Sequence, residues 1–150
     1  MRSSDQHRYH GQCLCGQIRF AVDHIQPRMG HCHCTMCRKF HGAAFATFGE
    51  AKKEHFHWLA GDTLLKSFQA DNGTIRQFCS ECGSSLIFKP ANDPGKYVEF
   101  ALSALDGDVD VFPDAHIFVD YKANWSTICD GLPQYREYRV DESIEVKGQD

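Results

Sequence analysis

The chain has 150 residues and a net charge of −4, with 16 basic and 20 acidic side chains. This balance argues against a nucleic-acid groove, and the basic runs Arg38-Lys39 and Lys52-Lys53 are too short to neutralise a line of phosphates. No stretch approaches the roughly 20 apolar residues that a membrane span needs. We therefore expect a soluble protein with neither nucleic-acid nor membrane partners, and no oligomeric state is predicted.

The two ends of the chain are polar. The first ten residues lack the apolar segment of a secretory signal, so we expect a cytoplasmic protein whose thiols stay reduced. The length suits one domain with a substantial core. We predict a single domain over residues 10–140, with flexible tails at 1–9 and 141–150.

Apolar residues occur in short runs separated by turn residues, which predicts a mainly β fold. Asp71-Asn72-Gly73 is the strongest turn signal, because Asn and Gly tolerate a positive φ. Helix signals are scarce, and residues 105–113, rich in Asp and Gly, are expected to form a loop. The runs expected as strands are 18–22, 55–59, 64–68, 74–78, 85–88, 97–101 and 116–119.

Seven of the eight cysteines lie in three tight groups, which is typical of metal ligands rather than of disulfides. The groups are Cys13 with Cys15, Cys32 with Cys34 and Cys37, and Cys79 with Cys82. Seven thiolates are one short of two complete tetrahedral zinc sites. Zinc with four protein thiolates is structural, whereas zinc with three keeps a position for water or substrate. The remaining Cys129 is interpreted as a small buried hydrophobic residue.

Spacing alone allows two assignments of these cysteines. In the first, the Cys13 and Cys79 groups share one metal, and the three cysteines of the middle group hold the other. In the second, Cys32 and Cys34 join the Cys79 group, and Cys37 joins the first pair. We favour the first because three thiolates within six residues can surround one ion. Disulfides remain the alternative to metal.

The cysteine motifs resemble those of the glutathione-dependent formaldehyde-activating enzyme family, which includes centromere protein V-like proteins. The resemblance runs from about Gly11 to Tyr135 and covers all seven clustered cysteines in family order. It implies a β-tent of antiparallel sheets like that of Mss4, with zinc-binding cysteine knuckles. The segments that carry it are 11–16, 32–38, 78–83 and 116–119, with Lys122 and Trp125.

The resemblance also implies two zinc ions per chain. Cys13, Cys15, Cys79 and Cys82 would hold structural zinc, and Cys32, Cys34 and Cys37 catalytic zinc. The implied activity is that of a carbon–sulfur lyase that forms or cleaves S-hydroxymethylglutathione, the adduct of glutathione and formaldehyde. A small-molecule thiol such as glutathione is the expected partner. The alternatives are a non-enzymatic zinc-binding interaction module and a thiol or metal redox sensor.

A few further side chains near the cysteines are candidates for the site. Arg38 follows the last ligand of the middle group, and its planar guanidinium suits a substrate carboxylate. His31 or His33 is the alternative fourth ligand that would close the second metal site. The other histidines considered are interpreted as ordinary surface or strand residues: His41, His55, His57 and His116.

Overall fold

The computed structural model describes residues 7–139, and the described chain divides into two compact units. The first unit contains the residues up to Pro27 together with Gly49–Val111. The second contains Arg28–Phe48 and the residues from Phe112 onward. The tail expected at 141–150, and residues 1–6 of the tail expected at 1–9, lie outside the described residues.

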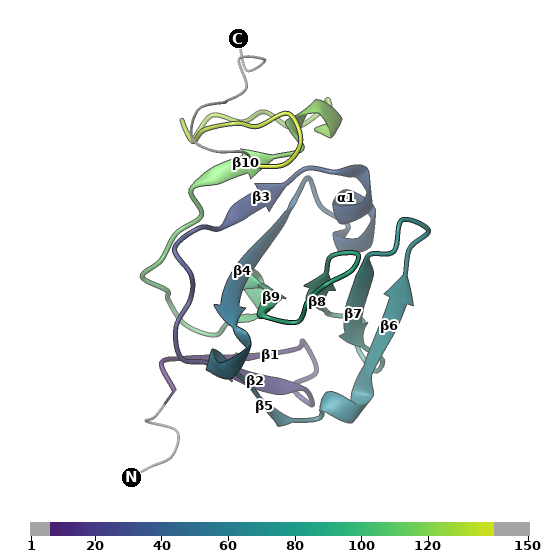
Figure 1. Ribbon diagram of the computed structural model, residues 1–150, viewed down its shortest axis with the longest axis vertical. Coiled ribbons are helices and arrows are strands. Elements are labelled where there is room, and N and C mark those ends of the chain that lie inside the picture. Colours follow the sequence, from purple (N-terminus) through teal and green to yellow (C-terminus); the bar gives the residue numbers. More distant parts are fainter. Residues whose placement is uncertain (1–6, 140–150) are drawn as a thin grey trace. The chain divides into compact units, whose positions relative to one another are not determined.

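Two groups of strands make up the first unit (Figure 1). One is an antiparallel sheet in the order β1-β2-β5, and the other runs β4-β9-β8-β7-β6. Only the later residues of β4 belong to this unit. The elements are β1 (Tyr9–Gln12), β2 (Arg19–Val22), β4 (Ala46–Lys52), β5 (Phe56–Ala60), β6 (Leu65–Gln69), β7 (Ile75–Cys79), β8 (Ser85–Lys89) and β9 (Tyr97–Ala101), with the 3-10 turns η2 (Lys53–His55), η3 (Asp62–Leu64) and η4 (Leu102–Ala104).

Aromatic side chains fill the core of the first unit. Phe20 and Phe100 are almost wholly buried, and their ring centroids lie 5.9 Å apart. Phe20 also stacks on Phe56 at 5.1 Å. A Cβ added to Gly49 would lie 2.6 Å from Phe100 Cζ, so the absence of a side chain there lets the ring approach β4. Burial of these large side chains provides much of the free energy that stabilises the unit.

The second unit is built around β3 (Gly30–Cys32), which pairs in parallel with β10 (Ala115–Ile117) and antiparallel with the first residues of β4. It also contains η5 (Val119–Tyr121) and α1 (Thr35–His41), the one α-helix among residues 7–139. The Cys34 sulfur caps the start of α1 by accepting a hydrogen bond from the Cys37 N–H at 3.2 Å. The helix ends at His41 and is capped by Gly42, whose φ of 61° is left-handed.

The predicted mainly β fold is confirmed, and every run expected as a strand overlaps one. The last run, expected over 116–119, ends at Ile117 because Phe118 has a left-handed φ of 58°. Four elements were not predicted from the sequence: β1, β3, β4 and α1. These elements are short or contain Gly and Ala, so their local preference is weak. None of the described helices has the length and apolar character to cross a bilayer.

Gly61 provides a test of the packing beside the first cysteine turn. Its φ is +75°, and an added Cβ would lie 2.0 Å from the Gln17 carbonyl oxygen. We expect Gly61→Ala to lower the free energy of unfolding by about 3 kcal/mol or more, because backbone strain and overpacking add. Gly107→Ala is the matched control, since its φ is +76° with no heavy atom within 4 Å. It should cost only about 1 kcal/mol. Urea unfolding measures both, and equal losses would contradict the contact argument.

The carboxyl of Glu99 on β9 is expected to make the free energy of unfolding depend on pH. Burial, with Glu50 and Asp93 nearby, raises the pKa of its carboxyl to about 7 from an ordinary value of 4.5. Between these two values the folded state binds more protons than the unfolded state, so stability falls as the pH rises.

Glu99→Gln should therefore leave stability near pH 4.5 almost unchanged and raise it by about 3 kcal/mol above pH 7. The exposed Glu54→Gln serves as the control and should change neither value. Unfolding curves at a series of pH values measure the difference. A pH profile that Glu99→Gln leaves unaltered would contradict the prediction.

Candidate metal centres

Four cysteine sulfurs of the first unit lie within 4.8 Å of one another. Cys13 and Cys15 stand in the turn after β1, while Cys79 ends β7 and Cys82 follows in the next turn. The Sγ atoms of Cys13 and Cys15 are 3.6 Å apart, and those of Cys15 and Cys79 are 3.9 Å apart. Sulfurs around one tetrahedral zinc, each at 2.3 Å, would be about 3.8 Å apart. The cluster therefore fits zinc, and these distances are too long for disulfides.

The two cysteine turns share one backbone conformation and one hydrogen-bond pattern. Gly16 and Gly83 each have a φ of 81°, and each closes its turn by donating to the carbonyl of the first cysteine, at 3.0 Å and 2.8 Å. The Leu14 N–H donates to Ser84 Oγ at 2.8 Å and so joins the two turns. Such turns bring both sulfurs of a pair to the same side.

Backbone N–H groups point at these sulfurs. The N–H of Ile18 donates to Cys13 Sγ at 3.3 Å, and that of Glu81 donates to Cys79 Sγ at 3.4 Å. Burial raises the pKa of Cys79 to about 11. Burial acts to raise the pKa of Cys82 also, but hydrogen bonds from the Ser84 side chain and backbone lower it to about 6. Four thiolates this close would repel one another without a cation, whereas the N–H donors favour the thiolate form.

The second cysteine cluster lies in the second unit, where Cys32, Cys34 and Cys37 have their sulfurs within 4.8 Å of one another. Cys32 ends β3, Cys34 caps α1 and Cys37 lies in its first turn. Hydrogen bonds with the other two thiols, together with burial, raise the pKa of Cys32 well above its ordinary value. No histidine or carboxylate among residues 7–139 joins this cluster at the same distance. The donor set suits a soft or borderline metal and leaves a fourth position open.

The structure groups the sulfurs in the first of the two ways that spacing allows. It places the two candidate closing ligands, His31 and His33, elsewhere. His33 is fully buried, and its Nε2 lies 2.8 Å from Nδ1 of His116. Burial, followed by the charge of His116, lowers the pKa of His33 to about 4. Burial likewise lowers the pKa of His31.

Arg38, the candidate substrate-binding residue, lies on α1 directly after Cys37. Its Nε is buried and has no hydrogen-bond partner within the described part of the chain. Cys129, expected to be buried, is exposed instead and belongs to neither cluster.

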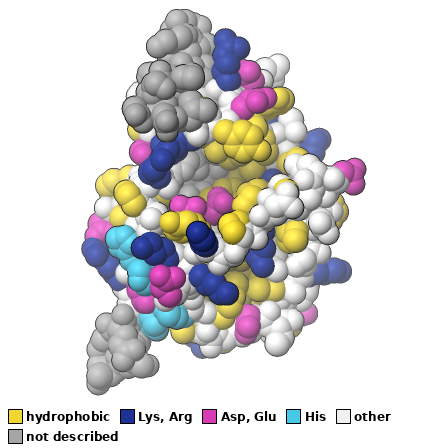
Figure 2. Space-filling view, viewed as in Figure 1, with side chains coloured by type: hydrophobic (Ala, Val, Ile, Leu, Met, Phe, Trp, Pro, Cys, Tyr) yellow, Lys and Arg dark blue, Asp and Glu magenta, His cyan; other side chains and the backbone are white. Residues whose placement is uncertain are grey.

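Two clusters of histidine and aspartate side chains were not predicted from the sequence. In the first unit, the Asp23 carboxylate lies 2.7 Å from both His7 Nδ1 and His57 Nε2. Figure 2 shows histidines gathered beside acidic and basic side chains on one face. In the second unit, His31, His116 and Asp130 have ligand atoms within 4.8 Å of one another. Members of one cluster are separated by 14 to 99 positions, so only the tertiary structure reveals them.

Comparisons with known proteins relate the chain to one family. The family model of the glutathione-dependent formaldehyde-activating enzyme matches residues 8–121. The chain is similar to an uncharacterized lyase of Schizosaccharomyces pombe, with 26% identity over 114 residues that cover 76% of this chain and 80% of the relative. A Rhodobacter sphaeroides protein of known crystal structure is 21% identical with a TM-score of 0.56, over 67% of this chain and 91% of that one. This last similarity shows the fold alone.

Proposed function

This chain belongs to the glutathione-dependent formaldehyde-activating enzyme family, and on that premise we propose that it is a zinc-dependent carbon–sulfur lyase-like enzyme. It forms or cleaves the adduct of a small-molecule thiol with an aldehyde, in the first instance S-hydroxymethylglutathione from glutathione and formaldehyde. The observation that carries the proposal is the convergence of Cys32, Cys34 and Cys37 without a fourth ligand among residues 7–139. A site completed by protein would instead suit a structural role.

The two cysteine clusters have different roles in this proposal. Cys13, Cys15, Cys79 and Cys82 hold a structural zinc, and Cys32, Cys34 and Cys37 hold a second zinc that takes part in catalysis. Zinc bound to the second cluster supplies a Lewis acid that lowers the pKa of a coordinating substrate thiol, so that the thiol reacts as a thiolate. Together with the zinc ion, the three thiolate ligands carry a net negative charge. This charge favours coordination of a substrate thiol over strong activation of water.

The chain's own residues position the reaction. The caps of α1 hold Cys34 and Cys37 on one short rigid segment, and β3 holds Cys32. In the forward direction the substrate sulfur bonds to the aldehyde carbon, and the thiol proton ends on the former carbonyl oxygen. Cleavage reverses both transfers, and neither direction needs an oxidant. Arg38 would orient the substrate by pairing with one of its carboxylates.

The division of roles between the clusters is tested by metal content and stability. We expect two zinc ions per chain in the wild-type protein and in Cys129→Ser, the control outside both clusters. Cys34→Ser should fold and hold one zinc. Cys79→Ser should lose most of its stability, because structural zinc binding contributes on the order of 10 kcal/mol in small zinc domains. Elemental analysis and thermal unfolding measure these outcomes, and equal destabilisation by both cluster variants would refute the division.

The thiol site itself is tested with cobalt in place of zinc. Binding of glutathione should strengthen the thiolate-to-cobalt charge-transfer absorption, since it adds one sulfur ligand. S-methylglutathione is the control, because its sulfur is blocked while its peptide is intact. Formation of the formaldehyde adduct, followed by nuclear magnetic resonance, should be faster with wild-type protein than with Cys34→Ser. An unchanged spectrum at saturating glutathione would exclude thiol binding, and an unaccelerated reaction would exclude this substrate pair.

A further inference from the structure

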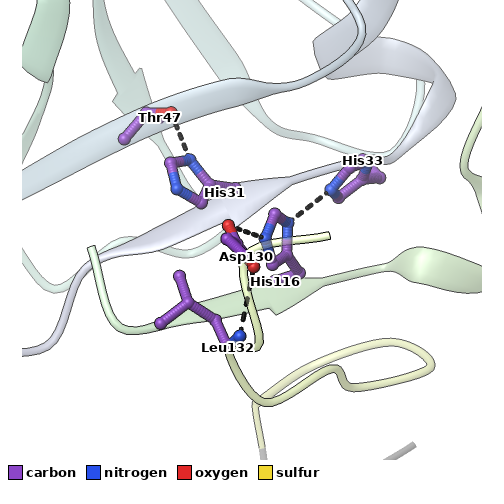
Figure 3. Close-up of polar contacts among 6 residues, drawn as sticks. All are labelled: His31, His33, Thr47, His116, Asp130 and Leu132. Carbon is purple, nitrogen blue, oxygen red and sulfur yellow. Dashed lines mark hydrogen bonds and ion pairs between the residues drawn. The ribbon is translucent and has the colours of Figure 1, made fainter. Parts of the chain in front are cut away.

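A second set of ligand atoms converges in the second unit, from His31, His116 and Asp130 (Figure 3). The parallel pairing of β3 and β10 sets His31 directly opposite His116, and their ring centroids lie 4.8 Å apart. The Oδ2 atom of Asp130 lies 2.9 Å from Nε2 of His116. The His116 side chain is only 3% exposed, whereas that of Asp130 is 46% exposed. The cluster is therefore anchored inside the unit and reached from its surface.

Each residue of this cluster makes a further hydrogen bond to a residue outside the cluster, as drawn in Figure 3. The contacts are His31 Nδ1 to Thr47 Oγ1 at 2.7 Å, His116 Nδ1 to His33 Nε2 at 2.8 Å, and Asp130 Oδ1 to the Leu132 N–H at 3.1 Å. Metal-binding histidines and carboxylates are held in this way, with the second polar atom hydrogen-bonded and the first directed at the ion. Each of the three residues also offers one ligand atom to the cluster, and these atoms lie within 4.8 Å of one another.

We propose that His31, His116 and Asp130 form a third metal site, which takes a borderline divalent cation of the zinc and cobalt type. Two imidazole nitrogens and a carboxylate oxygen are the donors that such cations prefer, whereas magnesium and calcium prefer oxygen alone. Three protein ligands leave further positions for water or a small anion. The proposal stands independently of the thiol chemistry proposed for the cysteines.

The third site is separate from the second cysteine cluster although His31 and Cys32 are neighbours in sequence. Successive side chains of a strand point to opposite faces, so His31 and Cys32 lie on opposite faces of β3. Cys32 packs with Ala46 and Ile117, whereas the His31 ring packs against Phe45 at 4.6 Å between centroids. One ion could not be shared between the two sets of ligands.

The hydrogen bonds that link Asp130, His116 and His33 also allow a metal to bind without a net gain or loss of protons by the two histidines. With both rings neutral and the Asp130 carboxylate accepting, His116 Nε2–H would donate to Asp130, and His33 Nε2–H would donate to His116 Nδ1. With a metal on His116 Nε2, His116 would carry its proton on Nδ1 and donate to His33, which would then carry its own proton on Nδ1. That His33 nitrogen is buried without a partner among the described residues. It can therefore gain the proton without breaking another hydrogen bond.

The test uses the full-length protein with both cysteine clusters saturated with zinc, and cobalt as the probe. We expect one further equivalent of cobalt to bind with visible d–d absorption and without thiolate charge transfer. Asp130→Asn should weaken this binding about 100-fold, because the anionic ligand is lost. The asparagine keeps an oxygen for the Leu132 N–H. Asp120→Asn is the matched control, since the Asp120 side chain is 45% exposed and lies in the same unit.

A second variant and a second readout keep the test independent of folding defects. Thr47→Val should weaken cobalt binding about 10- to 100-fold, because it frees the His31 ring without removing a ligand. Zinc at the third site should also switch His116 and His33 to their Nδ1–H tautomers, which nitrogen resonances report. The proposal is overturned by the absence of a third equivalent, by charge-transfer absorption from it, or by equal weakening in Asp120→Asn.

Discussion

The close approach of sulfur atoms is the constraint on which the rest of this structure depends. In the first unit two cysteine turns, 64 residues apart between Cys15 and Cys79, bring four sulfurs together. Each turn needs a glycine at a left-handed φ and is joined to the other through Ser84. The strands β1, β7 and β8 begin or end at these turns, so their registers and the sulfur positions are set together.

In the second unit a single strand contributes to two clusters of ligand side chains. The three residues of β3 direct a cysteine to one face and a histidine to the other. The cysteine face continues into α1, whose first turn supplies two more sulfurs, while the histidine face is completed by β10. One short strand anchors both clusters. A shift of its register by one residue would therefore turn its cysteine to the histidine face and its histidine to the cysteine face. Its pairing with both β10 and β4 therefore matters more than its length suggests.

Family membership and site geometry support different parts of the functional argument. Membership establishes relation to glutathione-dependent formaldehyde-activating enzymes over residues 8–121. Fold alone does not specify a substrate, because one fold can carry several activities. The open three-sulfur cluster is what argues for thiol chemistry in this chain.

The sequence by itself determined the fold class, the family and the cysteine groups, because these depend on local patterns: alternation along strands and close spacing of like ligands. It also favoured, over a rival pairing, the assignment that separates the middle three cysteines from the other four. It did not reveal β3 or β4, whose short or Gly- and Ala-containing segments have weak local preference. Only the tertiary structure brought His31, His116 and Asp130 together, since parallel pairing joins segments about 85 residues apart and no local signal encodes that register.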